Sequence, residues 1–120
     1  PMPMAHGEGR FTTADPVLAR NLAESVTLRY ARADGGAAGG FPANPNGSGA
    51  NAAGLSGGDG NVLALMPHPE RAQDLAQVPE WLGGAWGDRR RAAGGRNLDG
   101  DGPGLRLFHA LARELGVRRS

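Results

Sequence analysis

The sequence predicts an α/β fold. Three segments, at residues 25–32, 52–56 and 61–66, carry the alternating or continuous apolar pattern of β-strands. Two further segments, at residues 15–24 and 103–116, place their apolar residues on one face, which is typical of amphipathic helices. A chain that contains both kinds of segment in succession is typical of proteins with mixed layers of helix and sheet.

Both helices have recognisable end signals. Asp15 is a favoured N-cap and Pro16 suits a first turn, so the first helix is expected to begin there and to end near Glu24. Pro103 is expected to open the final helix, and Gly116 is expected to end it as a C-cap. This final helix carries an apolar stripe that consists of Leu105, Phe108, Leu111, Ala112 and Leu115.

The two later strands predict a β-hairpin. They flank the segment 57–60, Gly-Gly-Asp-Gly, which suits a four-residue loop. The second strand, residues 62–66, is a continuous apolar run, and this predicts burial on both faces. It leads to His68, and sites in open α/β sheets usually lie beyond the carboxyl ends of strands. Residues 34–51 are rich in Gly, Ala, Asn and Pro and predict a long loop.

The composition bounds what the chain can be. Its 120 residues form at most one domain, or part of a larger one. Leu, Val and Phe number 21 of the 120, which predicts a weak core for an independent domain and suggests that part of the hydrophobic interior lies elsewhere. The net charge of +1 gives no reason to expect nucleic acid or an acidic membrane as partner. No apolar run approaches the length of a bilayer span, so a cytoplasmic protein is expected.

The segment Met66-Pro67-His68-Pro69-Glu70 is the strongest candidate site. A residue before proline favours extended backbone, and residues two apart in an extended chain project to the same side. Glu70 is therefore expected to reach one ring nitrogen of His68 and to leave the other free to accept a proton. This is the base and orienting acid of a nucleophilic triad whose nucleophile is missing. The alternative is a proline-rich strand exit with a structural histidine.

A second His-x-Glu triplet lies at His6-Gly7-Glu8. Together the two triplets could supply two imidazoles and two carboxylates to a divalent metal, since both groups are ordinary Zn²⁺ ligands. The alternative is a histidine at a strand end whose neighbouring glycines allow backbone to approach a ligand or another strand. The chain has no cysteine, which excludes disulfides, thiolate metal sites and a cysteine nucleophile within these residues.

Three further segments favour structural interpretations. The block 44–48, Asn-Pro-Asn-Gly-Ser, is typical of a turn. The three arginines at 89–91 are expected to begin a polar, solvated loop. Neither Trp81 nor Trp86 has a basic patch around it in the sequence that would suggest stacking on nucleic-acid bases.

Taken together, these segments resemble a known family. The blocks that carry the resemblance are Ala5-His6-Gly7-Glu8-Gly9-Arg10-Phe11, Leu28-Arg29-Tyr30, Asn44-Pro45-Asn46-Gly47-Ser48, Ala53-Gly54-Leu55, Met66-Pro67-His68-Pro69-Glu70-Arg71 and Gly102-Pro103-Gly104-Leu105-Arg106-Leu107-Phe108. Their order and spacing resemble the C-terminal part of the glutaminase domain of phosphoribosylformylglycinamidine synthases, which are class I glutamine amidotransferases. The tail, with the tryptophan-containing segment before it, is more similar to the large single-chain form than to the small separate subunit.

The resemblance implies a fold and a reaction. The fold is the C-terminal portion of an α/β/α sandwich with an incomplete sheet, so that residues 1–120 are a C-terminal fragment of the amidotransferase domain. In the reaction, a cysteine thiolate attacks glutamine, His68 acts as base and then as acid, and Glu70 orients it. The resemblance further implies that His6 and Gly7 line the glutamine pocket.

The resemblance also implies partners and cofactors. The rest of the glutaminase domain and a synthetase region are the expected partners, and the ammonia released would serve a step of de novo purine synthesis. ATP and Mg²⁺ belong to that parent enzyme, and this chain is expected to bind no cofactor or metal of its own.

The sequence departs from the family pattern at the nucleophile and at several local positions, among them Gly49, where the family commonly has proline. The nucleophilic cysteine lies upstream of the resembled part, so the chain alone is expected to be inactive. Gly104 stands where the family usually has a bulky residue. Two other classes of function stay open, namely a non-catalytic interaction module derived from the same fold and a metal-dependent hydrolase that uses both His-x-Glu triplets.

Overall fold

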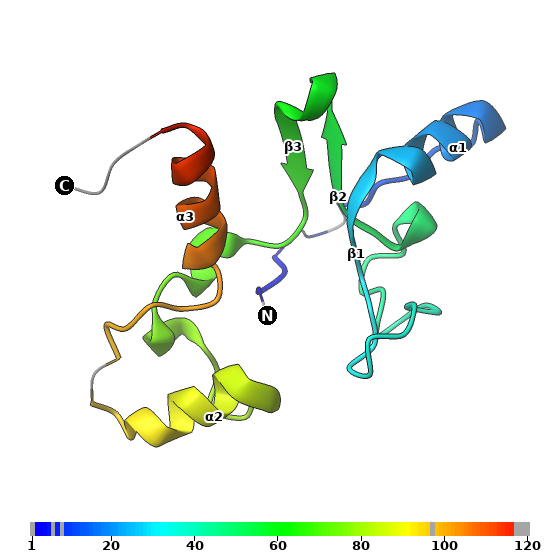
Figure 1. Cartoon of the computed structure of the whole chain (residues 1–120). Coiled ribbons are helices and arrows are strands. Elements are labelled where there is room, and N and C mark those ends of the chain that lie inside the picture. The colour runs from blue at the N-terminus through cyan, green and yellow to red at the C-terminus, as the bar shows by residue number, and fades with distance from the viewer. Residues whose placement is uncertain (1, 6, 8, 97, 117–120) are drawn as a thin grey trace. The chain divides into compact units, whose positions relative to one another are not determined.

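The computed structural model describes residues 2–5, 7, 9–96 and 98–116. Helices and strands succeed one another along the chain, so the predicted α/β class is confirmed (Figure 1). The chain divides into two compact units, one formed by Ala5–Pro67 and the other by Pro1–Met4 together with His68–Ser120.

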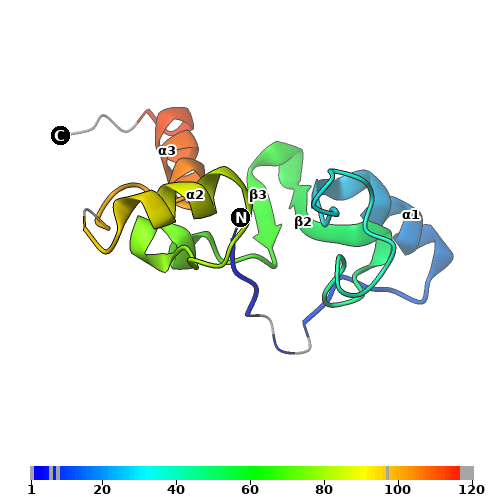
Figure 2. The same ribbon diagram turned by 90° about the horizontal axis from the view of Figure 1, so that it is seen from below.

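Helix α1 (Pro16–Ser25) begins where the sequence predicts. The Asp15 carboxylate accepts hydrogen bonds from the backbone N–H groups of Val17, at 2.7 Å, and Leu18, at 3.2 Å. These contacts satisfy donors that have no partner within the helix itself. Helix α1 lies beside strand β2 (Ala52–Gly57) in both views of the molecule (Figures 1 and 2).

The sheet of the unit Ala5–Pro67 is antiparallel. Among the described residues it contains β1 (Val26–Arg29), β2 and β3 (Val62–Leu65), in the order β1-β2-β3. The predicted hairpin is confirmed, with its loop one residue later than expected, because Gly57 pairs with Val62. The first strand is shorter than predicted, since register shifts interrupt its pairing with β2.

The prediction that the second hairpin strand is buried on both faces is wrong. The exposed fraction is 57% for Val62 and 48% for Leu63. β3 is an edge strand, while the buried residues of the sheet lie on β2, where Ala52 is fully buried and Ala53 nearly so. An apolar run is buried only where other elements form a layer over it, and the described residues leave β3 open.

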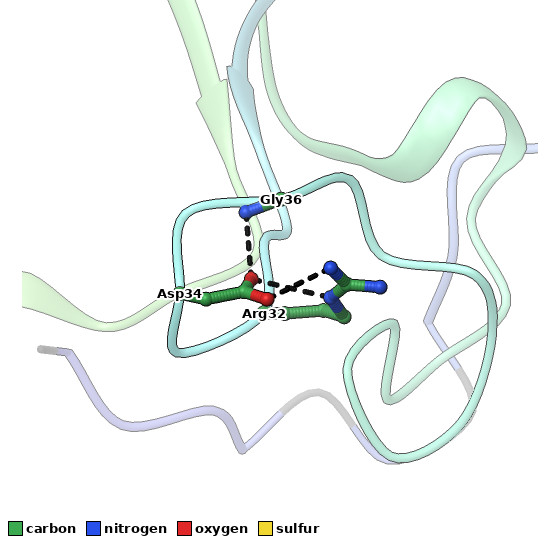
Figure 3. A network of polar contacts seen from close by, with 3 residues as sticks. All are labelled: Arg32, Asp34 and Gly36. Atoms are coloured by element: carbon green, nitrogen blue, oxygen red, sulfur yellow. Dashed lines mark hydrogen bonds and ion pairs between the residues drawn. The ribbon is translucent and has the colours of Figure 1, made fainter.

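The long loop after β1 is held by its own side chains. Arg32 donates two hydrogen bonds to the Asp34 carboxylate, at 2.8 and 3.2 Å (Figure 3). The backbone N–H of Gly36 donates to the same carboxylate at 2.9 Å. These contacts lower the pKa of Asp34, with the Arg32 hydrogen bonds as the largest cause. The charges of this turn therefore neutralise one another.

The second unit carries short helical turns before its two α-helices. They are η3 (Pro69–Ala72), η4 (Leu75–Gln77), α2 (Gly84–Ala93) and α3 (Leu105–Glu114). Ala72, Leu75 and Val78 are among its buried apolar residues. The final helix is confirmed, and Gly116 follows it with φ of +67°, as a C-terminal glycine does. Its apolar stripe stays largely exposed at Leu111 and Leu115.

The prediction of a polar loop at the arginine triplet is wrong, because α2 runs through it. Arginine and alanine are good helix formers, and Gly94 adopts the left-handed conformation, with φ of +54°, that ends a helix. The triplet is also not simply solvated. The Arg90 side chain is only 13% exposed and pairs with Glu80 at 3.1 Å.

The surroundings of Trp86 also differ from the expectation. The guanidinium of Arg89 lies 5.3 Å from the ring centroid, and that of Arg106 lies 5.2 Å from it. One comes from the next turn of α2 and the other from α3, so folding brings together cations that the sequence separates. No helix in the described residues has the length and apolar content that crossing a bilayer requires.

Candidate active site

The Pro-His-Pro-Glu segment joins extended backbone to a helical turn. His68 has φ of −105° and ψ of 90°, which is the extended conformation that a following proline favours. Pro69 then opens η3 at its first position, where a missing N–H costs nothing. The backbone N–H of His68 donates to the carbonyl of Pro3 at 2.8 Å, and its own carbonyl accepts from Arg71 at 3.1 Å. His68 is thus held from both sides.

The expected contact between the two side chains is present. Nδ1 of His68 lies 2.5 Å from Oε1 of Glu70. The expected route to it is wrong in one detail, because the extended backbone stops at His68 and Glu70 lies within η3. The helical turn, rather than the alternation of a strand, brings the carboxylate back to the ring.

The electrostatics of the pair follow from this contact. The hydrogen bond to His68 is the largest of the effects that lower the pKa of Glu70. Glu70 is therefore ionised at neutral pH and accepts the hydrogen bond, which assigns the ring proton to Nδ1. The other ring nitrogen, Nε2, receives no hydrogen bond within the described part of the chain.

Accessibility completes the chemical picture. The side chain of His68 is 32% exposed and that of Glu70 is 50% exposed, so the ring is neither sealed in the core nor fully solvated. An imidazole with an oriented Nδ1–H and an accessible Nε2 can accept a proton from a nucleophile and deliver it to a leaving group. The pair can therefore do general acid–base chemistry.

The second His-x-Glu triplet has only its central residue, Gly7, among the described residues. His6 and Glu8 lie outside the described residues. Gly7 is exposed and adopts φ of +56°, a conformation that favours glycine. No group of three or more His, Asp or Glu side chains that could hold a metal ion occurs among the described residues. The role of His6 and Gly7 in a glutamine pocket stays a prediction.

The Asn-Pro-Asn-Gly-Ser block does more than turn the chain. Ser48 is buried, and its hydroxyl accepts a hydrogen bond from the N–H of Phe11 at 3.0 Å. The Asn46 side chain donates to the carbonyl of Gly9 at 3.1 Å, and the N–H of Gly49 donates to that of Phe11 at 2.8 Å. The block thus tethers the segment that contains the Gly-Arg-Phe end of the first motif.

Sequence reasoning missed this tether because its partners are 37 residues apart. A signal was available, since Asn44 and Ser48 are polar residues in a block that the family resemblance singles out. Asn44 is buried too, and its amide donates to the Ser48 carbonyl at 2.9 Å. Buried polar groups need such partners.

The sequence as a whole matches the CobB/CobQ-like glutamine amidotransferase domain family over residues 1–113. The chain belongs to this family. The match includes the Pro-His-Pro-Glu segment and most of α3, so it covers one unit completely and most of the other.

Individual relatives bear the name of a phosphoribosylformylglycinamidine synthase or of its subunit PurQ. A phosphoribosylformylglycinamidine synthase subunit PurQ of Methanothrix thermoacetophila is 36% identical over 121 residues, which cover 99% of this chain and 41% of the relative. The PurQ subunit of Natronomonas pharaonis is 51% identical over 72 residues, which cover 59% of this chain and 31% of the relative. The phosphoribosylformylglycinamidine synthase of Drosophila melanogaster is 47% identical over 78 residues, which cover 63% of this chain and 6% of the relative.

The matches cover only part of each relative's length. The amidotransferase chain spans about two fifths of the first of these relatives and less of the others. Both the separate subunit and the long single chain occur among them. The expected greater similarity to the single-chain form therefore stays a prediction.

Proposed function

We propose that this chain is the C-terminal part of a glutaminase domain that releases ammonia from glutamine for a phosphoribosylformylglycinamidine synthase. The observation that carries the proposal is the 2.5 Å contact between Nδ1 of His68 and Glu70, in a chain that belongs to an amidotransferase family. The names of the relatives support the purine-synthesis role.

In the proposed reaction, His68 is the base and Glu70 its orienting acid. Nε2 of His68 takes the proton of a cysteine thiol that another part of the glutaminase domain supplies. The thiolate attacks the side-chain amide of glutamine, and the imidazolium returns the proton to the departing ammonia. Glu70 keeps the ring in the productive tautomer and stabilises the imidazolium while it carries the charge.

The remaining parts of the proposal lie outside this chain. The synthetase region would receive the ammonia and would use ATP and Mg²⁺, and no step of that reaction is assigned to these residues. Glutamine and the remaining regions of the glutaminase and the synthetase are the proposed partners. A cytoplasmic location stays a prediction.

The proposal has a direct test in the purified chain. The 120-residue polypeptide is expected to show no glutaminase activity, because it holds no cysteine. Measurable hydrolysis of glutamine by the chain alone, followed as release of glutamate, would contradict the assigned roles. A metal analysis of the same sample tests the alternative of a metal-dependent hydrolase. A stoichiometric divalent ion in the purified chain would favour that alternative.

The nucleotide sequence upstream of Pro1 distinguishes the glutaminase from the non-catalytic interaction module. A reading frame that continues upstream of Pro1 into a cysteine-containing strand-to-helix turn supports the glutaminase. A start codon immediately before Pro1 would favour an interaction module instead.

A further inference from the structure

The helical turn that carries Glu70 is held from behind by the segment that opens the final helix. The first turn of α3 lies beside η3 (Figure 1). The N–H of Gly104 donates to the carbonyl of Ala72 at 2.7 Å, and the N–H of Gly102 donates to the carbonyl of Gln73 at 2.5 Å. Two backbone hydrogen bonds therefore join the end of η3 to the segment 102–104, which is buried throughout.

The segment 102–104 approaches η3 so closely that there is no room for a side chain at Gly102 or Gly104. A Cβ atom at Gly104 would lie nearer than 3.0 Å to the backbone carbonyl of Pro69. A Cβ atom at Gly102 would also lie nearer than 3.0 Å to the backbone carbonyl oxygens of Ala72 and Asp74. Backbone cannot swing aside as the end of a flexible side chain can. Gly104 has φ of −70°, so the closeness of η3, and not the local conformation, requires glycine here.

Gln73 extends these contacts to the catalytic pair. Its carbonyl accepts from Gly102, and its side-chain amide donates to the carbonyl of Glu70 at 3.1 Å. The backbone of Glu70 is thus fixed through η3 by residues some 30 positions later in the chain. The His68–Glu70 contact depends on the position of that backbone, because Glu70 lies within η3 and not in an extended strand.

We propose that Gly102, Gly104 and Gln73 are positioning residues, which hold Glu70 against the ring of His68. The inference rests on the proposed glutaminase function. The three residues touch no reacting atom and act through Glu70.

The test uses the full-length protein that contains this chain. Gly104→Ala is compared with Gly83→Ala, whose added Cβ meets nothing within 4 Å and whose φ of −76° suits alanine. We expect Gly104→Ala to lower the glutamine-dependent kcat about 10²-fold, the cost of a misplacement near 1 Å, with KM for glutamine nearly unchanged. Gly83→Ala is expected to match the parent, and ammonia-dependent synthesis is expected to persist in both.

A second readout separates positioning from general damage. If Gly104 acts through Glu70, then Gly104→Ala costs little further activity once Glu70→Gln is present. Effects that multiply in the double variant, or an equal loss of ammonia-dependent synthesis, would overturn the inference, as would a Gly104→Ala enzyme that matches Gly83→Ala. If Gly104→Ala does not fold, Gln73→Ala decides in the same way: a loss of kcat that vanishes in the Glu70→Gln background supports the inference, and an unchanged kcat refutes it.

Failure of the underlying function has a different signature. His68→Ala in the same assay reports on the proposed glutaminase alone. If His68→Ala keeps full glutamine-dependent activity, the proposed function fails. If His68→Ala abolishes it while Gly104→Ala and Gln73→Ala do not reduce it, only the positioning inference fails.

Discussion

Two turns of this chain place a basic side chain and a carboxylate two residues apart, and they differ in what the basic side chain can do. In one, Arg32 donates two hydrogen bonds to the Asp34 carboxylate, and the N–H of Gly36 donates a third (Figure 3). In the other, one ring nitrogen of His68 contacts Glu70, and the second has no hydrogen-bond partner among the residues that the structure describes. Each contact lowers the pKa of its carboxyl group.

The difference lies in the side chains and their surroundings. A guanidinium keeps its proton at every accessible pH, so the Arg32–Asp34 pair can only hold a loop. An imidazole exchanges its proton near neutral pH and has two distinct nitrogens, so one can be oriented while the other reacts. The comparison teaches that spacing alone does not define a site, because the proton must also be free to move.

The largest expected effect comes from removing the imidazole. In the full-length protein, His68→Ala should lower glutamine-dependent synthesis by about 10²- to 10⁴-fold, the usual contribution of a positioned acid–base group. Ammonia-dependent synthesis should persist, because added ammonia bypasses the glutaminase. The measurement is the ratio of the two rates.

Arg32→Ala is the matched control, since it removes the cation of the other turn. It should leave both rates unchanged. Equal loss of both rates in His68→Ala would instead assign this histidine a structural role.

A smaller effect is expected from neutralising the acid. Glu70→Gln keeps the shape of the side chain but offers an amide where the ring needs a carboxylate, so the imidazolium loses its stabilising charge. We expect a fall in glutamine-dependent kcat of about 10²-fold, less than for a fully buried orienting acid, because Glu70 is half exposed. Asp34→Asn makes the same change in the other turn and should leave kcat unchanged. A similar loss of kcat in both variants would contradict the proposed difference between the two turns.

The pH dependence of the two carboxyl groups sharpens the contrast further. Both have a lowered pKa, so each favours the folded state above the ordinary carboxyl range near ~4, and that contribution disappears as the pH falls through the lowered pKa. His68→Ala removes the largest cause at Glu70, so its pKa should rise toward the ordinary value while that of Asp34 stays low. Carboxyl-carbon NMR titration of both residues measures this, and an unmoved Glu70 would show that the ring contact is not made in solution.

The smallest effect concerns stability. Asp34→Asn breaks an exposed ion pair, and such pairs contribute little because solvent screens them. A slight fall in melting temperature is expected, well below that of Leu75→Ala, which should cost about 2–5 kcal/mol through a cavity in the buried cluster of Ala72, Leu75 and Val78. Thermal unfolding followed by circular dichroism compares the two. A larger loss in Asp34→Asn would mean that the loop is part of the core.

Prediction from the sequence succeeded where neighbours in sequence are also neighbours in space. The N-cap at Asp15, the hairpin between β2 and β3 and the glycine after α3 depend on residues within one turn. It failed for the burial of β3, and it failed for α2, where the surrounding glycines led to the expectation of a loop although arginine and alanine favour a helix. The surroundings of Trp86 were missed as well, because Arg106 lies 20 residues away along the chain.

By itself, the sequence predicted that His68 and Glu70 meet, because the partners are only two residues apart. The contact forms through the helical turn η3 and not through the extended chain that the two prolines predicted. Only the tertiary structure decided what holds that pair. The contact of Gly102 with the carbonyl after η3 joins residues about 30 positions apart. The tether from Ser48 to Phe11, which belongs to the other unit, joins residues 37 positions apart. Such contacts depend on how the helices, strands and loops pack together, and the residue pattern within one segment does not show which distant segment it will contact.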